Sequence, residues 1–219
     1  CPGPRKHAVT GPRPARHQPG MEGRRPLTDS ADIVERADGS PNGDPWLVDR
    51  ARRGDRSAKR ALFQRHAPAV ASLLRRTFGR DVDVRDGVQQ TFLVAFRELE
   101  RLREPAAFRV WLLRIALRSG RQLWWTHRVR ELLVPKGAEE DPLWDASEVR
   151  SDLSPDDRAE LVLLGRRLGR LPIALRHAVV VRHAFGHTLE ETATICGCSL
   201  ATINRRLAEA EKRLRGETS

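Results

Sequence analysis

The side chains best suited to bind a nucleic acid lie together near the C-terminal end of the sequence. Thr202 and Asn204 carry groups that pair with base edges, and Arg205 and Arg206 carry guanidinium groups that bind phosphates or guanine. All four are predicted to face outward on a helix that begins after Ser199. The residues expected to contact DNA are Ser199, Leu200, Ala201, Thr202, Asn204, Arg205 and Arg206.

Two short helices around a tight turn are predicted to position this surface. Thr188 and Glu191 form a capping box that starts the first helix, Gly197 ends it, and Ser199 caps the second. The predicted buried sides are Leu189, Thr192, Ala193 and Cys196 on the first helix and Leu200, Ile203, Leu207, Ala210 and Leu214 on the second. This pattern is typical of a helix-turn-helix, whose second helix enters the major groove of DNA. A helical packing unit that touches no DNA is the alternative.

A second stretch, residues 121–130, places two adjacent tryptophans among arginines. Bases stack on aromatic rings while guanidinium groups hold phosphates, so this composition favours binding to single-stranded DNA. Neighbouring residues on a helix point about 100° apart, so Trp124 and Trp125 do not easily face the same core, and at least one should lie near the surface. The alternative is that both tryptophans pack against neighbouring helices.

Several histidines and cysteines lie close enough in sequence to be considered as zinc ligands: His177, His183, His187, Cys196 and Cys198. Cys196 falls on a predicted core face and Cys198 in a turn, which favours small buried hydrophobic residues over a metal site. The sequence contains no recognisable pairing of nucleophile and base and no glycine-rich phosphate loop. We therefore expect no enzymatic activity, no cofactor and no metal.

The composition favours a polyanionic partner. The 40 Lys and Arg residues exceed the 29 Asp and Glu residues, which gives a net charge of +11. A genome rich in G and C would also enrich arginine, so the charge alone does not establish nucleic-acid binding. The three cysteines make no disulfide framework, and no apolar run reaches the length of a membrane span. A cytoplasmic protein without membrane insertion is expected.

The periodicity of apolar residues predicts an all-α fold. Two small helical domains are expected, joined by a flexible acidic linker, with the helix-turn-helix in the second. Residues 1–43 are predicted to be a disordered lead, 44–131 the first domain, 132–157 the linker and 158–216 the second domain.

The helices of the first domain are predicted from their caps and breakers. Asp44 is expected to cap the first helix, and Pro68 to bend or break the second, which covers residues 57–78. Asp81 or Asp83 can cap the third helix. Gly120 is expected to weaken the fourth by about 1 kcal/mol relative to alanine.

The order of these segments resembles the extracytoplasmic-function (ECF) group of bacterial sigma factors, small two-domain members of the sigma-70 family. The resemblance covers residues 44–215. The motifs that carry it are ALFQRHAPAV (61–70), DGVQQTFLVAF (86–96), FRVWLLRIA (108–116) and LPIALRHAVVVRHAFGHTLEETATICGCSLATINRRL (171–207). Each motif is weak alone, and their order makes the match specific.

The resemblance implies a protein that binds core RNA polymerase, directs it to promoters and helps to open the DNA, while the polymerase performs the chemistry. The implied partners are the β′ clamp and β flap of the polymerase, promoter DNA and an anti-sigma factor. The implied polymerase-binding residues are Asp86, Gln89, Gln90 and Phe92. The residues implied to capture the minus-10 element are Arg114, Arg118, Arg121, Gln122, Trp124, Trp125 and Arg128, and the recognition helix would read the minus-35 element.

The sequence departs from the family's usual residues at several positions. Gly87 stands where relatives usually have leucine, Gln90 where they have an acidic residue, and Glu209 where many have an arginine that contacts the DNA backbone. Arg118 and Gln122 stand near positions that commonly hold Asn and Asp. These changes imply a divergent promoter preference or weak DNA binding without polymerase. A helix-turn-helix regulator that acts without polymerase is the alternative, but it would have no use for the surface at 86–96.

Overall fold

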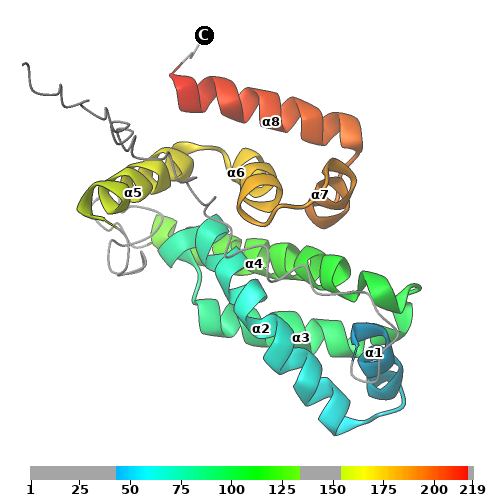
Figure 1. Ribbon diagram of the computed structural model, residues 1–219. Coiled ribbons are helices and arrows are strands. Elements are labelled where there is room, and N and C mark those ends of the chain that lie inside the picture. Colours follow the sequence, from blue (N-terminus) through cyan, green and yellow to red (C-terminus); the bar gives the residue numbers. More distant parts are fainter. Residues whose placement is uncertain (1–42, 134–153, 217–219) are drawn as a thin grey trace, which may run out of the picture.

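The computed structural model describes residues 43–133 and 154–216 (Figure 1). Within these ranges the ordered elements are helices, and no strand occurs, so the predicted all-α class is confirmed. The predicted lead and most of the predicted acidic linker lie outside the described residues. Among the helices of the described ranges, none is long and apolar enough to cross a membrane.

The first half of the molecule, residues 43–133, is built on three long helices that pack against one another, with a short helix against the first of them (Figure 1). The helices are α1 (Asp44–Arg52), α2 (Arg56–Phe78), α3 (Val84–Arg97) and α4 (Phe108–Leu133). Short 3₁₀ turns connect them: η2 (Gly79–Asp81), η3 (Leu99–Arg101) and η4 (Pro105–Ala107).

Side-chain caps define two of these helix starts. Asp55 caps α2, and Asp83, the second of the two predicted candidates, caps α3 by accepting from the Arg85 N–H at 2.8 Å. The prediction for Asp44 was wrong, because Gly43 is the cap residue of α1 and Asp44 is its first helical residue.

The Asp44 carboxylate instead joins α1 to α2. It lies 2.7 Å from His66 Nε2 and 2.8 Å from Arg65. Burial raises the pKa of Asp44, but the hydrogen bonds and charges of His66 and Arg65 outweigh burial and leave the pKa below its usual value. The first turn of α1 is therefore tied to the middle of α2.

Helix α2 continues through Pro68, so of the two predicted outcomes, a bend or a break, the break does not occur. Proline removes one backbone donor, whereas Leu62 and Val70 on either side of it are fully buried in the core. Packing along the whole length of α2 therefore outweighs one lost hydrogen bond.

Gly120 lies where α4 crosses α2. A Cβ atom at this position would lie 2.4 Å from Phe78 Cε2 and 2.7 Å from Leu74 Cδ2, so glycine is what allows the two helices to approach. The expected weakness of α4 at this point is thus offset by close packing. At Gly87 a Cβ atom would lie 2.7 Å from Leu74 Cδ1, so the leucine usual in relatives would require Leu74 to move.

The second half, residues 154–216, contains four α-helices: α5 (Pro155–Arg170), α6 (Ile173–Val179), α7 (Leu189–Cys196) and α8 (Leu200–Arg215). A π-helical turn, η6 (Val180–Ala184), follows α6. Helix α5 begins before residue 158, the predicted domain boundary, because Ser154 caps it. Leu168 and Leu171 are buried beside Ala210, whereas Leu164 on the same helix is 42% exposed.

The two halves are packed together. Val180, Val181 and Ile195 of the second half belong to the same buried cluster as the core of the first, and α6 and α7 lie between α8 and α4 (Figure 1). The buried Arg176 side chain donates across the contact to the Thr77 carbonyl at 3.0 Å. We call this packing of α6 and α7 against α2 and α4 the closed arrangement.

His177 is buried inside this contact. Its ring meets the ring of Phe78 edge to face, with centroids 5.3 Å apart, and Arg121 lies 3.5 Å from its Nδ1 atom. Burial lowers the pKa of His177 to about 3, helped by the positive charges of Arg121, Arg176 and Arg206. The imidazole is therefore neutral in the folded protein at physiological pH.

We predict that His177 makes the protein less stable as the pH falls from about 6.5 toward 3. In this window the unfolded chain binds a proton at His177 that the folded chain excludes, so the free energy of unfolding decreases. Urea unfolding at pH 7 and pH 5 should show a loss on the order of 1–2 kcal/mol that is absent in His177→Leu. His183→Gln, at an exposed histidine, is the matched control. Equal pH dependence in His177→Leu and the unchanged protein would contradict the assignment.

Candidate nucleic-acid interface

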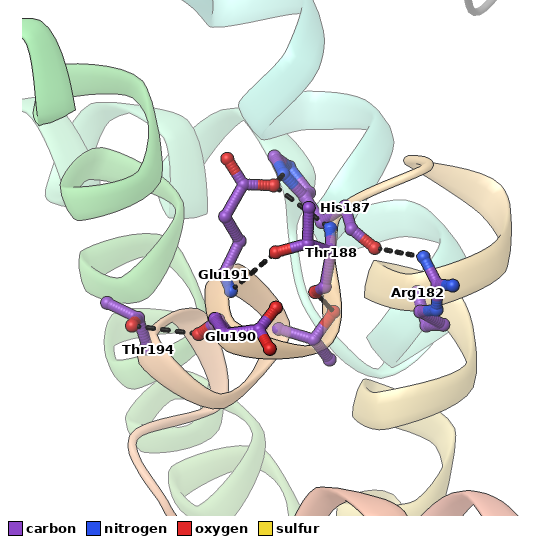
Figure 2. A network of polar contacts seen from close by, with 7 residues as sticks. Arg182, His187, Thr188, Glu190, Glu191 and Thr194 are labelled. Carbon is purple, nitrogen blue, oxygen red and sulfur yellow. Dashed lines mark hydrogen bonds and ion pairs between the residues drawn. The ribbon is translucent and has the colours of Figure 1, made fainter. Parts of the chain in front are cut away.

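The start of the helix-turn-helix is fixed by the predicted capping box (Figure 2). Thr188 Oγ1 accepts from the Glu191 N–H at 3.2 Å, and the Glu191 carboxylate accepts from the Thr188 N–H at 3.0 Å. The same carboxylate lies 3.0 Å from Nδ1 of the buried His187. Burial raises the pKa of Glu191, but the bonds from Thr188 and His187 outweigh it and hold the pKa below its usual value.

Further hydrogen bonds hold the segment before α7 and the turn after it. Arg182 donates to the His187 carbonyl at 2.6 Å, and the Thr194 hydroxyl donates to the Glu190 carbonyl at 3.0 Å (Figure 2). Gly197 ends α7 with a φ of 66°, a left-handed conformation that favours glycine. Ser199 Oγ then accepts from the Thr202 N–H at 3.2 Å, as predicted for the cap of α8. The left-handed conformation of Gly197 and the Ser199 cap therefore fix how α8 follows α7.

Helix α8 packs on α6 and α7 and turns its other face away from α4 (Figure 1). Of the seven residues predicted to contact DNA, five are exposed and two, Thr202 and Arg206, are half-buried; the exposed ones are Ser199, Leu200, Ala201, Asn204 and Arg205. Leu200 is 41% exposed, so its predicted place on the buried side was wrong. Leu200 is the first residue of α8, and the residues of this helix that are buried, Ile203 and Ala210, lie further along it.

The side chain of Arg205 is exposed, whereas that of Arg206 is half-buried and contacts the protein. The Arg206 guanidinium donates to Cys198 Sγ at 3.5 Å and lies close enough to His177 to lower the pKa of that residue. Arg205 is therefore the better placed of the two for a ligand bound to the outer face of α8. Glu209 on the same helix pairs with Arg213 at 2.6 Å, which partly neutralises its carboxylate.

The seven predicted minus-10 residues separate into two groups on α4. Arg114, Arg118 and Arg121 face α7 and line a cavity of about 270 Å³ together with Ile195, Cys196 and Gly197. Arg118 pairs with Glu98 at 3.2 Å. This basic face is thus directed toward the second half of the molecule in the closed arrangement.

The other group lies nearer the C-terminal end of α4, and its members are Gln122, Trp124, Trp125 and Arg128. Trp124 is half-buried and donates its Nε1–H to Asp81 Oδ2 at 2.9 Å, whereas Trp125 is 57% exposed. The expectation that at least one indole lies near the surface is confirmed. The rings meet edge to face at a centroid distance of 5.4 Å.

Helices α2 and α3 form an open groove of about 980 Å³. The sequence reasoning missed its two most exposed apolar side chains, Phe63 (40% exposed) and Leu93 (59% exposed). Leu93 could have been found as an apolar residue four positions after Gln89, on a helix face that is otherwise polar. Of the predicted polymerase-binding residues, Asp86, Gln89 and Gln90 are exposed and Gln89 lines the groove.

Phe92, the fourth predicted polymerase-binding residue, also lines the groove, but its side chain is almost completely covered. It is only 3% exposed, because its ring packs against the rings of Phe63 and Phe96, with centroid distances of 4.7 and 5.7 Å. It contributes the floor of the groove rather than its rim.

The candidate zinc ligands do not come together. Within residues 43–133 and 154–216, no group of three histidine, cysteine or acidic side chains is placed to share a metal ion. Burial, with a contribution from Cys198, raises the pKa of the Cys196 thiol to about 12. A protonated thiol is a poor metal ligand, and the half-buried Cys196 packs as a small hydrophobic residue.

Comparisons with known proteins match both halves. The family model described as Sigma-70 region 2 matches residues 62–128, and the model described as Sigma-70, region 4 matches residues 153–214. RNA polymerase sigma factor NccH of Alcaligenes xylosoxydans xylosoxydans is 32% identical over 179 residues, covering 80% of this chain and 94% of that protein. The ECF RNA polymerase sigma-E factor of Escherichia coli (strain K12) is 30% identical over 178 residues, with coverage of 77% and 91%.

Solved structures agree with this match. The structure of CnrH in complex with the cytosolic domain of CnrY superimposes with a TM-score of 0.56 at 25% identity, covering 79% of this chain and 95% of that one. The sigma factor RpoE in complex with the anti-sigma factor NepR from Bartonella quintana has a TM-score of 0.51 at 24% identity, covering 68% of this chain and 89% of that one, and shares the fold.

The two matches occur in the order expected of a sigma factor, and they favour that function over a regulator that acts without polymerase. The chain therefore belongs to the extracytoplasmic-function group of the sigma-70 family: it is a sigma factor that binds core RNA polymerase, directs it to promoters and assists the opening of DNA.

Proposed function

We propose that three separate surfaces of this sigma factor bind the polymerase, the minus-10 element and the minus-35 element. The groove between α2 and α3 binds the clamp of the polymerase β′ subunit, the C-terminal part of α4 binds the minus-10 element, and α8 reads the minus-35 element. The observation that carries this assignment is the α2–α3 groove, which exposes Phe63 and Leu93 beside the polar Gln89.

The chemistry of the groove suits a protein partner. Large apolar side chains exposed side by side mark interaction sites, because burying them on a partner removes them from water. Exposed polar residues, among them Asp86 and Gln89, are available to pair with the partner's polar groups. A helix laid along the groove, as in the clamp of the polymerase, would contact both.

We predict that Leu93→Asp weakens binding to core polymerase by roughly tenfold or more, because a charge would replace apolar surface at the centre of the contact. Binding is measured without DNA by fluorescence anisotropy of the labelled sigma factor. Leu200→Asp, at an exposed leucine on α8 outside the groove, is the matched control and should bind normally. Normal binding by Leu93→Asp would contradict the assignment of the groove.

Arg205 is the residue of α8 best placed to contribute charge to minus-35 binding. It is exposed on the outer face, while Arg206 donates to Cys198. A phosphate contact releases a counterion when it forms, so it appears in the salt dependence of binding. A guanine contact appears instead as base specificity.

We predict that Arg205→Ala weakens promoter binding by the holoenzyme and reduces the slope of log affinity against log salt by about 1. Arg206→Ala should change the slope less. The control is Arg213→Ala, because Arg213 already pairs with Glu209 on the same helix. An unchanged slope and unchanged base preference in Arg205→Ala would remove Arg205 from the interface.

Trp125 is proposed to stack on an unpaired base of the minus-10 element. It is the exposed member of the tryptophan pair, and stacking on an aromatic ring offsets part of the cost of removing a base from the helix. The neighbouring arginines of α4 are proposed to hold the phosphates of the separated strand.

The closed arrangement has to open for both elements to be bound at once. Positions −10 and −35 are about 85 Å apart along a straight duplex, whereas α7 lies directly against α4. The two halves are therefore proposed to be separate domains, as the sequence predicts, that move apart on the polymerase. Opening would also free Arg114 and Arg121 for DNA.

We predict that dyes on Arg76→Cys, at the end of α2 that contacts α6, and on Lys212→Cys in α8 move apart by tens of ångströms on forming the promoter complex. The native cysteines are replaced for this measurement, and both labelled positions are exposed. Energy transfer should be high in the free protein and low in the holoenzyme on promoter DNA. Undiminished transfer in an active promoter complex would exclude the opening.

An anti-sigma factor is proposed as a further partner. The CnrH structure contains the cytosolic domain of CnrY, so a relative of this chain is held by another protein. We propose that this chain is regulated in a similar way and that it acts in the cytoplasm, where polymerase and promoters are found.

A further inference from the structure

Asp81 connects the turn after α2 to the promoter-opening part of α4. Its Oδ2 atom accepts the hydrogen bond from Trp124 Nε1 at 2.9 Å. A carboxylate is a strong acceptor, so this bond fixes the indole more firmly than a neutral partner would. The ring of Trp124 also packs against the buried core of the first half. Trp124 is thus held at two points, by its polar edge and by its apolar face.

Trp125 depends on Trp124 for its own orientation. The two rings meet at 75° with centroids 5.4 Å apart, the edge-to-face arrangement that aromatic pairs favour. The guanidinium of Arg128 lies 5.8 Å from the centroid of the Trp124 ring. More than half of Trp125 is open to solvent, so the fixed ring of Trp124 is an important contact that orients it.

We propose that Asp81 is a positioning residue for DNA opening. By fixing Trp124, Asp81 also orients Trp125. The Trp125 ring then stacks on an unpaired base without the entropy cost of becoming ordered during binding. This inference rests on the proposed function of Trp125. It adds a residue that lies outside α4 and touches no DNA.

A second role for the Asp81 carboxylate has to be separated from this one. Asp81 also acts electrostatically on the buried Arg176 of α6, where its charge favours the protonated guanidinium. Its removal could therefore disturb the closed arrangement as well as Trp124. Trp124→Phe distinguishes the two roles, because it removes the donor and keeps an aromatic ring while leaving the charge of Asp81 in place.

The test follows opening of a promoter carrying 2-aminopurine in the minus-10 element by the complete holoenzyme. Asp81→Ala and Trp124→Phe should each slow opening by about tenfold, with unchanged affinity of the closed complex and unchanged core binding. The double variant should be no slower than either single variant, because both remove one interaction. Asp81→Asn should recover part of the rate, since its amide oxygen can still accept. Asp49→Ala, at an exposed carboxylate on α1, is the matched control.

The outcomes separate this inference from the function on which it rests. If Trp125→Ala opens DNA at the normal rate, the proposed stacking role is wrong and the role of Asp81 in it is also wrong. If Trp125→Ala is slow but Asp81→Ala and Trp124→Phe are normal, stacking stands and the positioning role is overturned. Additive losses in the double variant would also overturn it, because Asp81 would then act by another route.

Discussion

The buried guanidinium of Arg176 is the interaction on which the closed arrangement depends. Within the second half it donates to the Leu168 and Leu171 carbonyls, at 3.0 and 3.2 Å, and across the contact it donates to Thr77 at 3.0 Å. Burial lowers the pKa of Arg176, and the charge of Asp81 acts in the opposite direction. A buried cation needs all of its donors satisfied, so the end of α5, the start of α6 and the end of α2 are held in one geometry.

Local patterns predicted the helices well, because capping and periodicity act within a few residues. The capping box at Thr188 and the cap at Ser199 lie where the sequence indicated. Pro68 does not break α2, because tertiary packing along the helix outweighs the loss of one backbone donor. The effect of Gly120 was predicted from helix propensity alone. Its structural role depends on Phe78, which is distant in sequence but packs against Gly120 in the folded protein.

The packing of the two halves could not be predicted from periodicity. A single buried side was assigned to α7, but Ile195, outside that side, is 1% exposed because α7 also packs on α4. A helix with two buried sides has a wider apolar stripe, and the adjacent Ile195 and Cys196 were the only local sign of it. The candidate site was affected in the same way: residue types led to a prediction of which side chains bind DNA, but not to the finding that Arg114 and Arg121 line a cavity between the halves.

The position of Cys196 between α7 and α4 has a consequence for its reactivity. Thiols react with peroxides and alkylating agents as thiolates, and the raised pKa of Cys196 leaves very little of it in that form at neutral pH. Since the desolvation that raises this pKa includes the contact with the first half, the closed protein shields Cys196 from oxidants. The chemical sensitivity of this cysteine is therefore a property of how the halves are packed, and not of the residue alone.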